Sequence, residues 1–238
     1  MINAPSPATY QPLPIIAHED ASHIAQTSSL SRSRRSIGEP GKYWPQNSTI
    51  KIAMYDMEMD DPYVLAVKKA ASQWLPHINL NFEFVTGEEG DVRIGQYWPG
   101  GMEVSSTVGT DALSAAPWYA TMTLPMDHTT SSFELTVMHE FGHMLGAHHA
   151  HQHPDANIPW DQAKLDKHFT PRQQQLNVLP LPRSNLYDFS SYDPDSLMHY
   201  SIDPAWTTEN TFHSRNAMLS EGDIAWAKKA YPKASATT

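Results

Sequence analysis

The stretch HEFGHMLGAHH, residues 139–149, decides how the rest of the sequence is interpreted. On a helix, His139 and His143 lie one turn apart on the same face, so both imidazoles can bind one Zn²⁺. Glu140, rotated by about 100° around the helix axis from His139, flanks the metal without binding it. Gly146, three residues after His143, allows the backbone to leave the helix and bring His149 back as a third ligand. The pattern H-E-x-x-H-x-x-G-x-x-H therefore predicts a catalytic zinc site.

Three further histidines lie close to His149 in the sequence, namely His148, His151 and His153. Each of them is near enough to take the place of the third ligand, although the spacing favours His149. Two histidines on a helix can also be ordinary core or surface residues. The added glycine and third histidine at fixed offsets make a chance match rare in a chain of this length.

Composition narrows the classes of function that fit the chain. Its 238 residues carry 16 Lys and Arg against 26 Asp and Glu, a net charge of -10. This charge opposes binding to nucleic-acid phosphates and to anionic lipid, so we expect no nucleic-acid partner. No cysteine is present, which excludes disulfides, thiolate nucleophiles and cysteine zinc sites. No run of about 18 apolar residues occurs, so no membrane span is expected.

Hydrophobic periodicity places the zinc motif in an α/β domain. Alternating patterns predict strands over residues 49–54, 80–85, 91–97 and 120–125. Helical spacing predicts helices over residues 62–75 and 132–145, the second opened by a capping box of Ser131 and Glu134. Beyond residue 150 the chain is rich in proline. Only short helices near residues 162–168 and 171–176, and a last helix opened by Ser220 and Asp223, are predicted there.

The motif resembles that of the metzincin metalloendopeptidases, and SLMHY, residues 196–200, is similar to the Met-turn of their astacin-like branch. Weaker similarities to bacterial members lie at VGTDA (108–112), ATMTL (120–124) and Leu219–Ser220 with Asp223. The resemblance covers roughly residues 43–231. It implies a zincin-like α/β (α+β) fold. Such a fold has a twisted mixed sheet with an antiparallel edge strand and two long helices in an N-terminal subdomain (41–146). The irregular C-terminal subdomain (147–238) has the Met-turn and the terminal helix.

The resemblance also implies roles for individual residues. Met198 forms an apolar floor beneath the zinc ligands, and Tyr200 lies near the metal, ligates it and swings to stabilise the transition state. Ser105, Ser106 and Thr107 form the antiparallel edge strand above the cleft, to which the substrate adds as an extra strand. Without the resemblance, Met198 is a core methionine and Tyr200 a buried aromatic. The polar residues of an exposed edge strand also protect it from aggregation.

Two features depart from the astacin-like pattern. Ala150 stands where members usually have Glu after the third histidine, so we expect a salt bridge or hydrogen-bonded contact to be missing. The cysteines of the family are absent, so a cysteine switch is impossible, and the first 40 residues contain no Phe-x-Gly-Asp. Asp20 is one candidate for a residue that holds the enzyme inactive.

Residues 1–40 are rich in Pro, Ser and Ala and contain the basic cluster Arg32-Ser33-Arg34-Arg35. We interpret this segment as a flexible leader that is a plain tail, a pro-segment or an export signal. The start lacks the basic and apolar regions of a secretory signal peptide. We therefore expect secretion or translocation by another route, and a cytoplasmic location is the alternative.

The leading hypothesis is a zinc-dependent endopeptidase that acts on proteins or peptides and uses one catalytic Zn²⁺. Three neutral imidazoles leave one position at the metal open for water, from which Glu140 takes a proton as general base. Glu140 then returns the proton to the leaving amine as general acid, and Tyr200 stabilises the oxyanion. A narrower version is an exported toxin or effector. Alternatives are a catalytically silent zinc-binding module whose cleft binds proteins, and a histidine-rich metal-storage protein. Oligomeric state and cleavage preference are not predicted.

Overall fold

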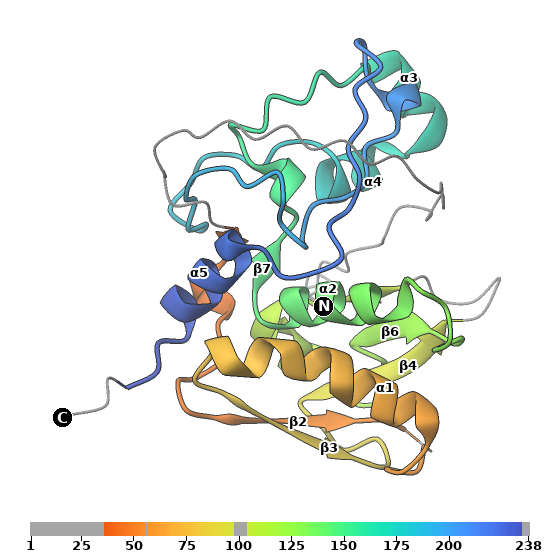
Figure 1. Cartoon of the computed structure of the whole chain (residues 1–238), viewed down its shortest axis with the longest axis vertical. Coiled ribbons are helices and arrows are strands. Elements are labelled where there is room, and N and C mark those ends of the chain that lie inside the picture. The colour runs from red at the N-terminus through yellow and green to blue at the C-terminus, as the bar shows by residue number, and fades with distance from the viewer. Residues whose placement is uncertain (1–35, 56, 98–103, 235–238) are drawn as a thin grey trace, which may run out of the picture.

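The structure is a computed structural model in which residues 36–55, 57–97 and 104–234 are described. Two regions are stacked in space: an N-terminal subdomain, residues 36–146, and a C-terminal subdomain, residues 147–234 (Figure 1). The first holds a mixed sheet and two long helices, and the second consists mainly of loops and short helices. The expected α/β architecture is confirmed. The predicted leader up to residue 35, with Asp20 and the basic cluster, lies outside the described residues.

The main sheet has five strands in the order β3-β2-β4-β6-β5. Their bounds are Thr49–Ala53 for β2, Asn81–Val85 for β3, Val92–Tyr97 for β4, Ser105–Ser106 for β5 and Met122–Pro125 for β6. The first four strands of this order pair in parallel, and β5 pairs with β6 in antiparallel orientation. Parallel pairing of β2 and β3 requires a crossover, which the intervening helix supplies. The predicted antiparallel edge strand is therefore present.

Helices α1 (Pro62–Ala71) and α2 (Phe133–Met144) pack on each other and on the sheet (Figure 1). Asp61 caps α1 by accepting a hydrogen bond from the Tyr63 N–H at 2.7 Å. The helix predicted to reach residue 75 is α-helical only to residue 71 and continues as the 3-10 helix η2 (Ser72–His77). Pro76 explains this change, because a proline lacks the N–H of a regular α-helical turn and clashes with the preceding one.

The capping box predicted at Ser131 and Glu134 is wrong. Helix α2 begins after Ser132, whose side chain makes no capping hydrogen bond. The Phe133 N–H instead donates to a backbone carbonyl in the preceding turn, at 3.1 Å from Thr130 O. Glu134 is turned towards α1 and pairs with Lys69 at 3.2 Å. The Glu134 carboxylate thus links α2 to α1 instead of capping the N-terminus of its own helix.

The first described residues are part of the folded domain, although their composition had placed them in the leader. Strand β1 (Ile37–Gly38) pairs in antiparallel orientation with β7 (Ala147–His148), and the 3-10 helix η1 (Pro40–Lys42) follows. Ile37 is completely buried. A Cβ atom at position 38 would lie 1.9 Å from the Tyr43 hydroxyl, so only glycine fits there. The N-terminal segment is therefore fixed against the chain that leaves the zinc motif.

The C-terminal subdomain has four short helices and one longer helix. Their bounds are Ala150–Gln152 for η4, Gln162–His168 for α3, Pro171–Asn177 for α4, Pro204–Trp206 for η5 and Glu221–Ala230 for α5. The capping box predicted for the last helix is confirmed, since Ser220 and Asp223 bond each other's backbone N–H. Trp226 on α5 meets Trp74 edge to face at 6.0 Å, which joins this helix to the main core.

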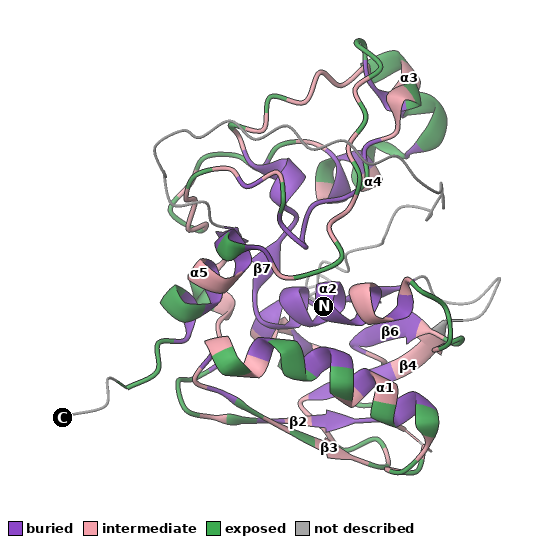
Figure 2. Cartoon of the chain, viewed as in Figure 1, coloured by how far each residue is buried: buried purple, intermediate pink, exposed green. Residues whose placement is uncertain are grey.

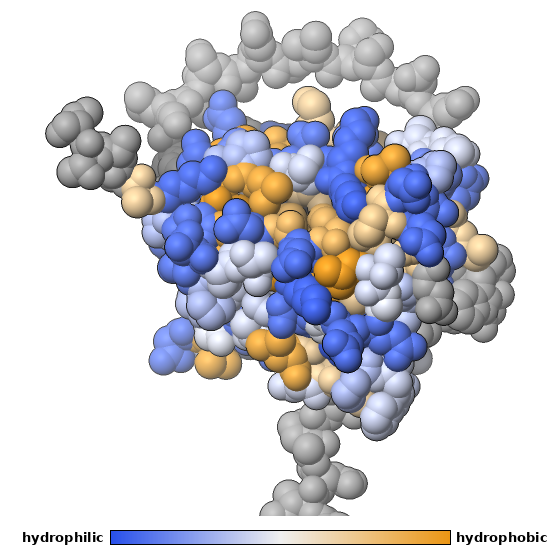
Figure 3. Space-filling view, turned by 90° about the horizontal axis from the view of Figure 1, so that it is seen from below, coloured by the Kyte–Doolittle hydropathy of each residue, from blue (hydrophilic) through white to orange (hydrophobic). Residues whose placement is uncertain are grey.

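Burial is greatest along α2, which is almost entirely covered (Figure 2). Seen from the side of the N-terminal subdomain, hydrophobic residues form small patches divided by hydrophilic residues (Figure 3). Within the described part of the chain, no helix is both long and apolar enough to cross a membrane. Buried polar residues are therefore concentrated around α2, where the two subdomains meet.

Candidate active site and metal centre

Helix α2 positions the first two histidines of the motif. His139 and His143 are each 1% exposed, and their rings lie 4.8 Å apart between centroids. Between them, a Cβ atom at Gly142 would lie 2.3 Å from the sulfur of Met198. The glycine therefore allows the Met-turn to approach the helix closely at a position between the two histidines.

The chain leaves α2 at Gly146, which has a φ of +97°. This left-handed conformation suits glycine and is rare for other residues. The Gly146 N–H donates to His143 O at 2.8 Å, and a Cβ atom at this position would lie 2.8 Å from the Tyr43 ring. Strand β7 then carries the chain to His149, which is completely buried. The sharp exit predicted from the glycine is present.

Hydrogen bonds fix the orientation of all three imidazoles. Each ring donates its Nδ1–H to an oxygen: His139 to Leu197 O at 3.0 Å, His143 to Ala147 O at 2.8 Å and His149 to Gln152 Oε1 at 3.3 Å. The Nε2 atom of each neutral ring therefore carries a lone pair. Such outer hydrogen bonds select the tautomer that binds a metal.

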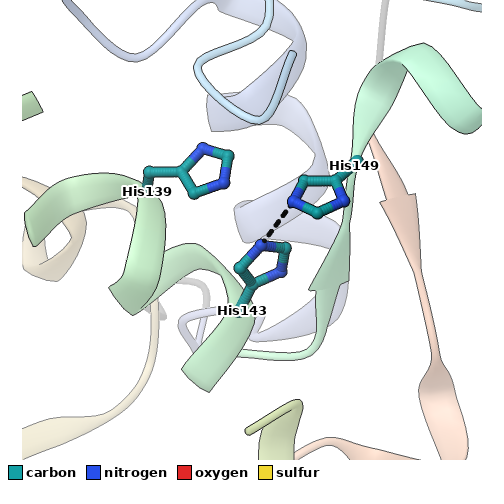
Figure 4. Close-up of side chains that lie close together, drawn as sticks. All are labelled: His139, His143 and His149. Atoms are coloured by element: carbon teal, nitrogen blue, oxygen red, sulfur yellow. Dashed lines mark hydrogen bonds between the residues drawn. The ribbon is translucent and has the colours of Figure 1, made fainter. Parts of the chain in front are cut away.

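The three Nε2 lone pairs converge (Figure 4). One ligand atom from each histidine lies within 4.8 Å of the others, and the Nε2 atoms of His143 and His149 are 3.0 Å apart. Nε2 of His139 has no hydrogen-bond partner among the described residues. Two facing lone pairs and an unpartnered buried nitrogen are unfavourable unless a cation lies between them. The donor set of three neutral nitrogens fits Zn²⁺.

Burial also keeps the three rings neutral. It lowers the pKa of His139 and His149 well below the usual value and the pKa of His143 to about 3. The cause is the loss of hydration of the charged imidazolium in the interior. A metal requires neutral imidazoles, so the site is prepared to bind without first releasing protons.

The neighbouring histidines are directed to other partners. Their Nε2 atoms contact Glu39 Oε2 at 2.8 Å for His148, Asn177 O at 2.7 Å for His151 and Ser190 O at 2.6 Å for His153. The structure thus brings together the three residues that the spacing favoured. The other three hold loops and the N-terminal segment in place.

Glu140 lies beside the ligands and is 2% exposed. Its Oε2 has no hydrogen-bond partner among the described residues. Burial raises the pKa of Glu140 to about 8, and the nearby Arg215 guanidinium acts in the opposite direction. A divalent cation in the histidine site would also lower this pKa. The carboxyl group is therefore able to hold or release a proton near neutral pH.

Arg215 is a residue of the site that the sequence did not indicate. Its Nε is buried without a hydrogen-bond partner in the described part of the chain. Burial lowers the pKa of Arg215, and the nearby Tyr200 and Glu140 raise it. A lone arginine in a loop has no distinguishing spacing, so only the fold reveals that it lies near Glu140 and Tyr200.

The Met-turn packs against α2 at Gly142, between the first two histidines of the motif. Met198 is completely buried, and its carbonyl accepts a hydrogen bond from the Ala150 N–H at 3.0 Å. The Tyr200 ring lies near two of the imidazoles, with centroid distances of 4.0 Å to His149 and 5.7 Å to His139. The structure therefore places Tyr200 within the site. A side-chain contact at position 150 is absent because alanine has no polar group.

Asp223 anchors the Met-turn to α5. Its carboxylate accepts hydrogen bonds from Ser36 Oγ at 2.5 Å, Ser196 Oγ at 2.6 Å, Leu197 N at 2.7 Å and Ser220 N at 3.0 Å. The capping box predicted only the bond with Ser220. One buried carboxylate therefore joins the N-terminal segment, the Met-turn and the terminal helix.

Ser105, Ser106 and Thr107 differ from the expectation of an exposed edge. They lie at the end of the sheet, in and after β5, but they are 5%, 1% and 5% exposed. Helix α2 packs against β5, and the Thr107 N–H donates to Thr121 O at 2.8 Å. Their small polar side chains therefore suit a covered strand next to the helix that carries the ligands.

Comparison with known proteins identifies one family of peptidases, by a family model and by solved structures. The family model for astacin, which describes a family of peptidases, matches residues 36–231. One solved structure, "Structure of myroilysin", is 33% identical in sequence and has a TM-score of 0.75. The match covers 84% of this chain and 100% of the myroilysin chain. A second match, to a crystal structure of myroilysin that is also 33% identical, has a TM-score of 0.62 and covers 81% of this chain and 86% of the myroilysin chain.

A more distant structure shows the same fold. It is the hatching enzyme zinc-protease HCE-1 from the medaka fish Oryzias latipes, with 16% identity and a TM-score of 0.53. The match covers 85% of this chain and 97% of the hatching enzyme. The family match spans both subdomains and includes the three histidines, Glu140 and the Met-turn. The chain therefore belongs to the astacin family of peptidases and is a zinc metalloendopeptidase.

Proposed function

We propose that the chain cleaves proteins or peptides with His139, His143 and His149 as zinc ligands, Glu140 as general base and acid, and Tyr200 as oxyanion donor. The observation that carries this proposal is the convergence of three buried Nε2 lone pairs beside a buried carboxyl group. A silent zinc-binding module would have no use for a buried carboxyl group next to its ligands whose Oε2 has no hydrogen-bond partner among the described residues.

The chain's own residues account for the proton transfers. Bound Zn²⁺ supplies Lewis acidity and lowers the pKa of water in the site to about 7. Glu140 takes the proton from the attacking water, because its Oε2 has no competing protein partner in the described chain. The same carboxyl group then gives this proton to the leaving amine. The Tyr200 hydroxyl donates to the substrate carbonyl oxygen as negative charge develops on it.

We also propose that β5 and Thr107 align the substrate. The strand is the terminal strand of the sheet and packs beside α2, which carries two of the ligands. In the structure the residues of this edge are at most 5% exposed, so a peptide that pairs with it must first uncover its backbone. An extended peptide paired there would lie along the zinc site, with its main chain held by backbone hydrogen bonds. Peptides with single N-methylated amides test this alignment. A rise in KM at alternate positions is expected, and no dependence on position would contradict it.

The catalytic role of Glu140 is tested with Glu140→Gln, which keeps the shape of the side chain and removes its base. We expect casein cleavage to fall by about 10²-fold to 10⁴-fold, while one zinc per chain and the unfolding midpoint are retained. Glu134→Gln on the same helix, where Glu134 pairs with Lys69, is the matched control and should remain active. Equal activity in wild type and Glu140→Gln would remove Glu140 from the mechanism.

The same assay separates the alternatives. Chelator-sensitive cleavage by a wild-type chain that holds one zinc supports the peptidase. Zinc binding without cleavage supports the silent module, and several tightly bound ions per chain support metal storage.

The leader suggests a narrower function. We propose that the leader serves for export or as a pro-segment of the catalytic domain, residues 41–238, and that the enzyme is an exported toxin or effector. Because residues 37–40 pack against the folded domain, this role belongs to the part of the leader that precedes them, residues 1–35. Supporting this is the polar, proline-rich composition of the leader. Deleting residues 1–35, which precede the buried Ile37, should abolish export from the native host while casein cleavage by the purified chain persists. Unchanged export would contradict the proposal.

A further inference from the structure

A second group of buried imidazoles lies next to Tyr200 and takes no part in the zinc site. His151 stacks on the Tyr200 ring at 4.8 Å between centroids, with an interplanar angle of 24°. His199 lies 5.6 Å from His151, and both residues are 1% exposed. Burying several imidazoles together is costly unless their nitrogen atoms find partners, so the partners show what the group does.

His199 binds the backbone of Tyr200 on its carboxyl side. Its Nδ1 lies 2.7 Å from Tyr200 O, and because a carbonyl only accepts, Nδ1 must carry the proton. The Nε2 of the neutral ring then accepts from the Tyr192 hydroxyl, at 2.8 Å.

His151 binds the backbone of Tyr200 on its amino side. Its Nε2 donates to Asn177 O at 2.7 Å, which leaves Nδ1 as an acceptor for the Tyr200 N–H at 3.3 Å. Both hydrogen-bonding groups of the Tyr200 main chain are therefore held by imidazoles of fixed tautomer. This matters because residues 196–200 lie in neither a helix nor a strand that would otherwise set the backbone.

We infer that Tyr192, His199 and His151 form a hydrogen-bonded clamp that positions Tyr200, and that His199 is a positioning residue for peptide hydrolysis. The inference rests on the proposed role of the Tyr200 hydroxyl as oxyanion donor. A displacement of about 1 Å at a catalytic group can cost about 10²-fold in rate. Because the oxyanion exists only in the transition state, loosening the clamp lowers kcat and leaves KM nearly unchanged.

The test compares two amide replacements of His199. In His199→Asn the amide nitrogen falls near the position of Nδ1, so the bond to Tyr200 O is retained. In His199→Gln the amide lies near the position of Nε2, and that bond is lost. We expect His199→Gln to lower kcat by about 10-fold to 10²-fold with little change in KM, and His199→Asn to stay within about fivefold of wild type.

A double-variant cycle shows whether the effect passes through the Tyr200 hydroxyl. We expect Tyr200→Phe to lower kcat by about 10²-fold, and His199→Gln to cause no further loss in that background. Losses that multiply in the double variant would overturn the inference, as would equal activity of the Asn and Gln variants. A Tyr200→Phe enzyme as active as wild type would instead refute the proposed role of Tyr200.

Zinc content and unfolding midpoint are measured for every variant, so that loss of fold is recognised. Tyr192→Phe removes one oxygen atom at a partly buried position. It provides a second test of the clamp if the His199 variants fail to fold. We expect it to lower kcat by about threefold to tenfold with unchanged zinc content. A wild-type kcat in Tyr192→Phe would overturn the inference that Tyr192 is part of the clamp.

Discussion

The two subdomains are stabilised in different ways, although they share one catalytic centre. In the N-terminal subdomain the backbone is ordered by strand pairing and by the helices α1 and α2. In the C-terminal subdomain, long loops are held by side chains that bond distant carbonyls, such as Gln152 Nε2 to Leu176 O at 3.2 Å and to Leu179 O at 3.0 Å. Regular structure therefore carries two of the proposed zinc ligands, and a network of side chains supports the third.

The largest expected effect comes from breaking the link between the subdomains at the zinc site. His149→Ala removes the ligand that follows β7, and we expect zinc content and casein cleavage to be nearly lost. The control is His148→Ala next to it, which breaks a contact with Glu39 and leaves zinc content nearly unchanged. Metal analysis that gave the opposite order would contradict the ligand assignment.

Removing zinc from the wild-type chain sharpens the comparison of stability between the two subdomains. A ligand present at about 1,000 times its Kd stabilises the folded state by about 4 kcal/mol. The C-terminal subdomain has few hydrogen-bonded strand pairs. We therefore expect zinc removal by a chelator to speed the hydrogen exchange of its backbone amides more than that of the amides in β2 and β4. Equal acceleration in both subdomains would show that the metal stabilises the fold as one unit.

Much of the N-terminal subdomain was predictable because its signals are local. The alternation around Ile50 and Ile52 reports one buried face of a strand, and the spacing of His139 and His143 reports one face of a helix. The turn at Gly146 followed from glycine's backbone freedom. In each case the residues that interact lie within a few positions of one another.

The rest was not predictable because its signals are distant in sequence. The burial of Ile37 depends on pairing with β7, which lies more than a hundred residues later, and its neighbours have the composition of a tail. Likewise, the bond from His199 to Tyr192 has no periodic pattern. The exposed edge expected at Ser106 failed for the same reason, since α2 covers a strand whose own sequence looks polar.

A smaller effect is expected from a pair of capping carboxylates, one in each subdomain. Asp223→Ala leaves four hydrogen-bond donors without their acceptor in the interior, and we expect the free energy of unfolding to fall by about 3 to 4 kcal/mol. Asp61→Ala removes one capping bond at the start of α1 and should cost about 1 kcal/mol. Urea unfolding of both variants measures the difference. Equal losses would contradict the view that single side chains carry more stability in the C-terminal subdomain.

The smallest effect concerns acid pH and one imidazole of the C-terminal subdomain. His213 lies 3.9 Å from the His199 ring between centroids, and its buried Nε2 has no hydrogen-bond partner among the described residues. Burial lowers the pKa of His213, against the opposing effects of the Pro194 carbonyl and Asp195. Below the unfolded pKa of about 6.5, the unfolded chain therefore binds more protons at this residue than the folded chain does.

Stability from this residue is thus present above about pH 6.5 and is lost as pH falls towards the lowered folded pKa. We expect His213→Gln, which stays neutral, to flatten the dependence of the unfolding free energy on pH by at most about 1.4 kcal/mol per unit. His168→Gln at the exposed end of α3 is measured beside it as a matched control for replacing a histidine by glutamine. Urea unfolding between about pH 7 and 4.5 measures both slopes. Identical slopes in the two variants would mean that this imidazole is as well hydrated as a surface histidine.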